Sequence, residues 1–160
     1  MQKRLLTVLV CFLALSLSNF AQTKKSGKKA GSAGSIPDKA YMQKIWDGWS
    51  TMDPTNVAHF YAKGEHTFFD IAPLKYNNWE EYEAGVKQVL ADYKSATFTL
   101  NDDVQTHPAG EYVWGTATLK SDMTQKSGKR ELGNFRWTVV FQKQGGQWLI
   151  VHEHVSAPLQ

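Results

Sequence analysis

The sequence predicts an α+β domain in which three N-terminal helices pack on a curved antiparallel sheet. Apolar residues recur at helical spacing only in the first half of residues 36–160. Long strand-like runs fill the second half, with short turn signals such as Gly145-Gly146 between them. Helices followed by an antiparallel meander are typical of α+β domains. A curved sheet closed by helices forms a cone whose wide end can hold a ligand.

The spacing of apolar residues predicts three helices. The first starts near Pro37 and Asp38, which suit a helix N-terminus, and has a broad aromatic stripe that includes Trp46 and Trp49. The second is a short helix between Asp53-Pro54 and Lys63-Gly64. The third starts at Asn78, which together with Glu81 resembles a capping box.

Five strands are expected, and turn residues separate most of them. They cover residues 66–71, about 96–105, 111–122, 130–143 and 147–156.

The first 21 residues are typical of a secretory signal peptide, for which Ser16-x-Ser18 and Asn19-x-Ala21 are both possible cleavage sites. Lys3 and Arg4 precede an apolar run from Leu5 to Leu17, which is shorter than the roughly 20 residues that span a bilayer. We therefore expect export to a bacterial periplasm or the medium, with no membrane contact after cleavage; an uncleaved N-terminal anchor is the alternative. Cys11 is the only cysteine, so the mature chain is expected to have no disulfide.

Residues 22–35 form a Lys/Gly/Ser-rich segment that predicts a flexible linker before a single domain at 36–160. Removing the six basic residues of 1–35 changes the net charge from +3 to −3, so the basic character does not belong to the domain. Four lysines without an aromatic residue among them do not favour nucleic-acid binding.

The last strand, Trp148-Leu149-Ile150-Val151-His152-Glu153-His154 followed by Ser156 and Pro158, carries a family resemblance. It resembles the final strand of the nuclear transport factor two-like superfamily, especially its SnoaL-like branch and the kinase association domains. The resemblance implies the cone-shaped fold over 37–158 and leaves the function open, because this fold is used by both enzymes and binding proteins.

Asp70 is the first candidate for chemistry, because it lies between Phe69 and Ile71 where burial would raise its pKa. The sequence is similar to ketosteroid isomerase in placing Asp70 after Tyr61-Ala62 and before a proline, with one extra residue. This similarity implies a proton-transfer base. Alternatively, Asp70 caps the following turn or pairs with Lys75.

The isomerase also needs two acidic donors, which by resemblance fall near Ile45-Trp46 and near Trp137. Neither position has a hydroxyl or carboxyl group, so a true steroid isomerase is not expected.

Alternation along the last strand, combined with the family geometry, predicts which side chains face the cone. Leu149, Val151, Glu153 and Val155 would face it, and Trp148, Ile150, His152 and His154 would face a homodimer partner across the convex side. Glu153 would then be a second pocket carboxylate opposite Asp70, unless it pairs with Arg136 or Lys120. The predicted pocket residues are Trp46, Trp49, Phe68, Tyr82, Trp114, Thr116, Trp137 and Val155.

His152 and His154 could both reach one metal ion, but no third ligand stands at a recognisable spacing, so no metal or other cofactor is expected. Three functions remain. The first is a binder of a small, largely apolar ligand. The second is an isomerase, cyclase or hydratase that uses Asp70 as base without a cofactor, and the third is an oligomerisation module.

Overall fold

The computed structural model describes residues 35–159. In chain order its elements are α1 (Lys39–Trp49), the 3-10 helices η1 (Pro54–Asn56) and η2 (Ala58–Phe60), β1 (Glu65–Phe69), β2 (Tyr76–Asn78), α2 (Trp79–Leu90), β3 (Tyr93–Leu100), β4 (Gln105–Ala109), β5 (Tyr112–Gln125), β6 (Arg130–Gln144) and β7 (Gln147–Ser156).

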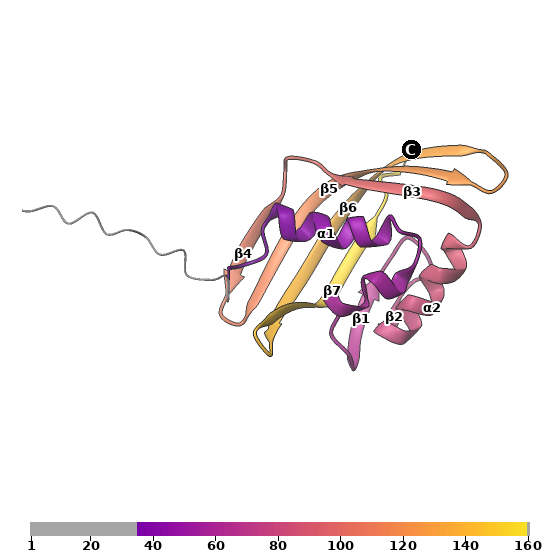
Figure 1. The fold of residues 1–160 in the computed structure, drawn as a ribbon. Coiled ribbons are helices and arrows are strands. Elements are labelled where there is room, and N and C mark those ends of the chain that lie inside the picture. The colour runs from indigo at the N-terminus through magenta and orange to yellow at the C-terminus, as the bar shows by residue number, and fades with distance from the viewer. Residues whose placement is uncertain (1–34, 160) are drawn as a thin grey trace, which may run out of the picture. The chain divides into compact units, whose positions relative to one another are not determined.

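A curved, open sheet of seven strands forms the body of the domain, and α1 lies across one face of it (Figure 1). The strand order is β2-β1-β7-β6-β5-β3, and β4 pairs with β5. β1 runs parallel to β7, whereas the other described pairs are antiparallel, so the sheet is mixed. The predicted α+β fold is confirmed. No helix among residues 35–159 is long and apolar enough to cross a membrane.

Three details of the elements differ from the prediction. The second helix is a pair of 3-10 turns, η1 and η2, rather than one helix. The predicted strand 96–105 is divided into β3 and β4. The short strand β2 was not predicted.

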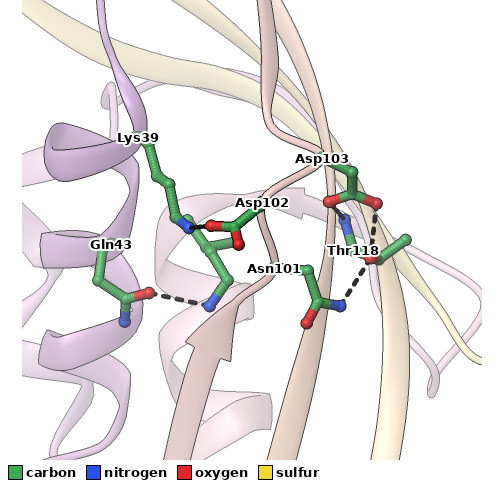
Figure 2. Close-up of polar contacts among 7 residues, drawn as sticks. Lys39, Gln43, Asn101, Asp102, Asp103 and Thr118 are labelled. Carbon is green, nitrogen blue, oxygen red and sulfur yellow. Dashed lines mark hydrogen bonds and ion pairs between the residues drawn. The ribbon is translucent and has the colours of Figure 1, made fainter.

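Polar side chains fasten α1 to the sheet (Figure 2). Gln43 accepts a hydrogen bond from the Leu100 backbone N–H at 2.9 Å and donates one to the Phe98 carbonyl at 2.9 Å. It thereby satisfies backbone groups on the free edge of β3. Lys39 pairs with Asp102 at 2.5 Å. These contacts hold the aromatic side of α1 over the sheet.

The interruption between β3 and β4 has a local cause, which Figure 2 also shows. The Asp103 carboxylate accepts hydrogen bonds from the backbone N–H of Thr118 at 3.0 Å and from its hydroxyl at 2.7 Å. Asn101 donates to the same hydroxyl at 2.8 Å. The Thr118 carbonyl still accepts a hydrogen bond from the Asn101 backbone N–H at 2.9 Å, but a side chain instead of a strand partner binds the Thr118 N–H.

α2 starts as predicted. The Asn78 side chain accepts a hydrogen bond from the Glu81 backbone N–H at 2.8 Å, and the Glu81 carboxylate accepts one from the Asn77 backbone N–H at 2.9 Å. This reciprocal pair satisfies backbone donors at the start of the helix. The helix buries Trp79, Tyr82 and Leu90 against the rest of the core.

A β-bulge changes the direction of side chains along β7, so strict alternation fails there. Val140 pairs with His152, but the next residue, Phe141, pairs with Ile150, which leaves Val151 as an extra residue. Trp148 and Ile150 are therefore buried in the core rather than placed beside the histidines. The expectation that Trp148 lies on the dimer face is wrong: its indole N–H donates to the Ser35 carbonyl at 3.0 Å.

The predicted orientation of β5 is also wrong. Val113, Ala117 and Leu119 are buried, and Ala117 pairs with the buried Trp137. Trp114 and Thr116 therefore face away from the helices, and Trp114 is 44% exposed. At Gly115 a Cβ would lie 3.1 Å from the Gln105 carbonyl oxygen and 3.5 Å from the Met42 side chain, so the tighter contact there is with β4 and not with α1.

Candidate functional site

A cavity of about 260 Å³ lies between α1, α2 and the sheet. Apolar side chains form most of its wall, with one carboxylate, Asp70. The lining residues are Trp46, Trp49, Asp70, Ile71, Ala72, Tyr82, Val86, Val89, Leu90, Tyr93, Phe98, Met123, Phe135 and Val155.

Five of the predicted site residues line this cavity: Trp46, Trp49, Asp70, Tyr82 and Val155. Three others form a buried layer behind the wall. Phe68 stacks on Tyr82 with ring centroids 5.3 Å apart, Trp137 meets Trp46 edge-on at 5.3 Å, and Glu153 is 1% exposed. Trp114 and Thr116 lie on the opposite face of the sheet and do not belong to the site.

Sequence reasoning missed part of the wall. Val86 and Leu90 belong to the same apolar helical stripe as Tyr82, so the sequence could have predicted them as lining residues. Phe98, Met123 and Phe135 come from β3, β5 and β6, so they meet only through the strand register. That register was not visible in the sequence.

Asp70 follows β1 directly and lies on the same side of the chain as Phe68, two residues earlier. Its Oδ1 accepts a hydrogen bond from the Ile71 backbone N–H at 2.7 Å. Burial raises the pKa of Asp70, and the Ile71 bond and the nearby Tyr82 hydroxyl only partly oppose that rise. Asp70 makes no ion pair with the described residues, Lys75 included. The Asp70 carboxylate therefore binds a proton more readily than an ordinary aspartate does, which favours a role as a general base.

Glu153 sits in a buried network of aromatic donors. Its carboxylate accepts hydrogen bonds from the Tyr61 hydroxyl at 2.8 Å and from the Trp137 indole N–H at 2.8 Å. Tyr61 accepts in turn from the Trp49 indole N–H at 3.1 Å. Burial raises the pKa of Glu153 to about 7, because these neutral donors offset the lost hydration only in part. Neither Arg136 nor Lys120 pairs with it among the described contacts.

Tyr82 links the cavity to this network. Its hydroxyl lies near both Asp70 and Glu153, and burial together with the two carboxylates raises the pKa of Tyr82 well above its usual value. Tyr82 therefore remains a neutral donor. Of the described residues that line the cavity, Asp70 alone can carry a charge at neutral pH. An anionic ligand would meet no cation there.

The two histidines lie on the other face of the sheet. His152 Nδ1 is 2.7 Å from the Thr67 carbonyl oxygen, and both histidine rings contact Phe69 edge-on. Trp114 lies on the same face, stacked on His107 with ring centroids 4.1 Å apart. Within residues 35–159, no three His, Cys, Asp or Glu side chains come together as metal ligands.

A second, larger hollow of about 490 Å³ lies beside the start of α1, near Tyr41, Phe60 and Trp148. Its one carboxylate, Asp38, is already engaged as the cap of α1 through the Tyr41 backbone N–H at 2.8 Å. We favour the smaller cavity as the site, because it combines apolar walls with a carboxylate of raised pKa.

Solved structures of the same fold come from several organisms. A nuclear transport factor two-like superfamily protein from Salmonella enterica has 17% identity and a TM-score of 0.69, covering 76% of this chain and 89% of its own. The calcium/calmodulin-dependent kinase association domain of C. elegans has 17% identity and a TM-score of 0.59, covering 74% and 91%. A candidate scytalone dehydratase from Novosphingobium aromaticivorans has 7% identity and a TM-score of 0.66, covering 74% and 79%.

At these identities the likeness concerns the fold alone. No curated protein sequence matches the chain. A sequence profile of the SnoaL-like domain, however, matches residues 39–160, which includes α1, α2 and every described strand. This protein therefore belongs to the SnoaL-like domain family.

Proposed function

We propose that this protein is an exported SnoaL-like domain that binds a small, neutral, largely apolar ligand in the cavity between α1, α2 and the sheet. The observation that carries the proposal is the cavity itself, which has a volume of about 260 Å³ and mostly aromatic and aliphatic walls. Sites of this composition gain affinity from apolar burial and orientation from a few polar groups.

Calorimetric titration tests this proposal with 1-tetralone, a bicyclic ketone, and with tetralin, the hydrocarbon that lacks its oxygen. We expect both to bind the wild-type protein. Val86→Trp would fill the cavity from α2 and should abolish binding. Ala84→Trp is the matched control, because Ala84 is exposed on the same helix and outside the cavity. Equal affinities for the wild type and the Val86→Trp variant would place the ligand elsewhere and overturn the proposal.

Asp70 supports a second candidate, an enzyme that moves a proton on a carbonyl compound. Its carboxylate would remove a proton from the carbon beside the carbonyl group, the C–H electron pair would form an enolate, and return of the proton would restore the ketone. The half-buried carboxyl group with a raised pKa in an apolar wall favours this chemistry.

Deuterium incorporation at C2 of 1-tetralone, followed by NMR in D₂O, tests the enzyme directly. An enzyme should accelerate exchange, and Asp70→Asn should remove that acceleration while 1-tetralone still binds. If the wild type binds 1-tetralone but exchange proceeds only at the uncatalysed rate, the enzyme hypothesis is excluded and the binding hypothesis stands.

The exposed face of the sheet supports a third candidate, assembly into dimers through His152, His154 and Trp114. Trp114 and Tyr112 are each 44% exposed there, and a related fold serves as a kinase association domain in C. elegans. Light scattering coupled to gel filtration should give a dimer for the wild type and a monomer for Trp114→Glu. A monomeric wild type would exclude assembly.

Export is proposed from residues 1–21, which lie outside the described part of the chain. Expression of the full chain with a C-terminal tag in a bacterium should place it in the periplasm or medium. Mass spectrometry should then give an N-terminus at Gln22, or at Asn19 where cleavage follows Ser18. A full-length cytoplasmic product would contradict export.

A further inference from the structure

The buried carboxyl group of Glu153 has a fixed donor on each of its two oxygens. The Trp49 indole N–H donates to the Tyr61 hydroxyl oxygen at 3.1 Å, and the Tyr61 hydroxyl donates to Glu153 Oε1 at 2.8 Å. The Trp137 indole N–H donates to Glu153 Oε2 at 2.8 Å. Because an indole nitrogen can only donate, the two tryptophans set the direction of these bonds. Both carboxyl oxygens therefore accept, whether Glu153 is ionised or protonated.

A proton on Glu153 must then find its acceptor at the remaining neighbour. The described side chains that can form hydrogen bonds with Glu153 are Tyr61, Trp137 and Tyr82. The first two are donors, so the Tyr82 hydroxyl oxygen is left to accept. Packing holds Tyr82 in this place: its ring stacks on Phe68 with centroids 5.3 Å apart, and Phe68 is the strand partner of Glu153.

The same hydroxyl also serves Asp70 in the cavity wall. A hydrogen bond from Tyr82 stabilises the ionised form of Asp70, and both residues line the cavity. A hydroxyl group has one hydrogen, so Tyr82 cannot donate to Asp70 and Glu153 at the same time. With Glu153 protonated, Tyr82 accepts from Glu153 and donates to Asp70. With Glu153 ionised, Tyr82 can donate to Glu153 instead, and Asp70 loses this donor.

We infer that Glu153 is a positioning residue for Asp70 and acts through Tyr82: protonated Glu153 turns the Tyr82 hydroxyl toward Asp70 and holds the Asp70 carboxylate ionised. The inference rests on the second candidate function, in which Asp70 is the base. Glu153 itself is 1% exposed and does not line the cavity, so it acts without touching a ligand. Burial raises the pKa of Glu153 to about 7, which places the change of partner near neutral pH.

The other groups around the two carboxyl groups keep their charge near neutral pH. Tyr61 after η2, Tyr76 on β2 and Tyr82 on α2 all have a raised pKa, chiefly because of burial, and so stay neutral. Neither carboxyl group forms an ion pair with a described residue. His152 and His154 lie on the opposite face of the sheet. The side chains from α1, β1 and β6 do not titrate: Trp49, Phe68 and Trp137.

Carbon-13 NMR of the side-chain carboxyl signals tests the inference on the protein without ligand. The wild-type Asp70 signal should move in two steps, one when Asp70 titrates and another near pH 7, when Glu153 ionises and takes the Tyr82 hydrogen. Glu153→Gln cannot titrate, so only the first step should remain, although both histidines still titrate. A single step in the wild type would overturn the inference without recourse to any variant.

Tyr82→Phe distinguishes this hydrogen-bond switch from direct repulsion between the two carboxylates. It keeps the stacked ring but removes the hydroxyl, so the pKa of Asp70 should rise and the second step should lose most of its size. Tyr61→Phe is the matched control, because it removes the other hydroxyl at Glu153. It should move the second step to higher pH without abolishing it. An undiminished second step in Tyr82→Phe would overturn the role of Tyr82.

Deuterium exchange of 1-tetralone separates failure of the inference from failure of the enzyme hypothesis. If the Asp70 signal has both steps but exchange is not accelerated, the coupling of Glu153 to Asp70 stands and the enzyme hypothesis fails. If exchange is accelerated, its rate in the wild type should change with pH near 7, and Glu153→Gln should remove that inflection. Accelerated exchange with a single Asp70 step would show that Asp70 acts alone and would overturn the inference.

Discussion

Glu153 is stabilised by neutral aromatic donors, Tyr61 and Trp137, in a part of the core that holds no described cation. Such donors compensate an ionised carboxylate less well than water does, so the protonated form is favoured in the folded state. The network also ties the cavity to the core, since Trp49 lines the cavity and donates to Tyr61.

The raised pKa of Glu153 makes stability depend on pH. Its pKa is about 7 in the folded protein and near 4.5 in the unfolded chain, so the folded state binds more protons between these values. The free energy of unfolding should therefore fall as pH rises from about 4.5 to 7, by up to about 3 kcal/mol. Urea unfolding across this range measures the loss.

Glu153→Gln should remove most of that loss, because the amide keeps hydrogen-bonding capacity without titrating. Asp70→Asn is the comparison: the pKa of Asp70 is also raised, so it contributes in the same direction. A Glu153→Gln profile parallel to the wild type would show that Glu153 is not the group responsible.

The two carboxylates differ in how far sequence could predict them. Asp70 could be chosen from its apolar neighbours Phe69 and Ile71, although these do not cover it. Ile71 is 55% exposed and Phe69 contacts the histidines on the other face, so the burial of Asp70 comes from the cavity wall. The hydrogen-bond partners of Glu153 could not be predicted from the sequence, because Tyr61 lies 92 residues away and Trp137 reaches Glu153 through the pairing of β6 with β7. The alternative that Glu153 pairs with Arg136 or Lys120 assumed that a buried acid needs a cation. In the structure neutral donors take that place.

At the scale of elements, Gly85 shows how packing reverses a helix propensity. Glycine inside a helix usually costs about 0.5–1 kcal/mol relative to alanine. Here a Cβ on Gly85 would lie 2.4 Å from the ring of Tyr76, whose hydroxyl donates to the Ala72 carbonyl at 3.3 Å. Tyr76 and α2 can therefore pack together only because Gly85 has no side chain.

Gly85→Ala should destabilise the protein by about 1–3 kcal/mol, as overpacking does, instead of stabilising it. Thermal unfolding measures the change. Ala84→Gly, one position away and exposed, should cost only the ordinary helix propensity of about 0.5–1 kcal/mol. A Gly85→Ala variant more stable than the wild type would contradict this packing.

The helices could be predicted from local sequence signals, whereas the orientation and irregularities of the strands could be predicted only in part. Local signals define α1 and α2, since Asp38 and Asn78 act as caps within a few residues of the backbone they satisfy. The orientation of β5 could have been predicted from the sequence, because one face of the strand is apolar and the other carries the threonines. The apolar face consists of Val113, Gly115, Ala117 and Leu119. The bulge at Val151 could not be predicted from the sequence, because β7 is apolar over Trp148–Val151 and its two faces differ little in sequence.

At the scale of the whole molecule, the fold followed from segregation of helices and strands, whereas the function depends on a few positions in one cavity. The same fold carries enzymes and binding domains, so the family alone does not decide between them. The charge of the lining is the most informative global property: one carboxylate and no described cation.

This charge predicts discrimination against anions. At pH 8, 1,2,3,4-tetrahydro-2-naphthoate should bind at least roughly tenfold more weakly than 1-tetralone of similar size, because its charge would be buried beside Asp70 without a counterion. Calorimetry gives both affinities. Asp70→Asn should reduce the difference between the two affinities, because it removes the charge repulsion. If the wild type binds the anion more tightly than the ketone, the predicted discrimination against anions is wrong.

A crystal structure of the protein with 1-tetralone tests the central claim, that the cavity between α1, α2 and the sheet is the ligand site. We predict density for the bicyclic ring between Trp49, Val86 and Phe135, which all line the cavity. Density for the ketone only in the hollow beside Tyr41 and Trp148, with the predicted cavity filled by protein side chains, would contradict the account.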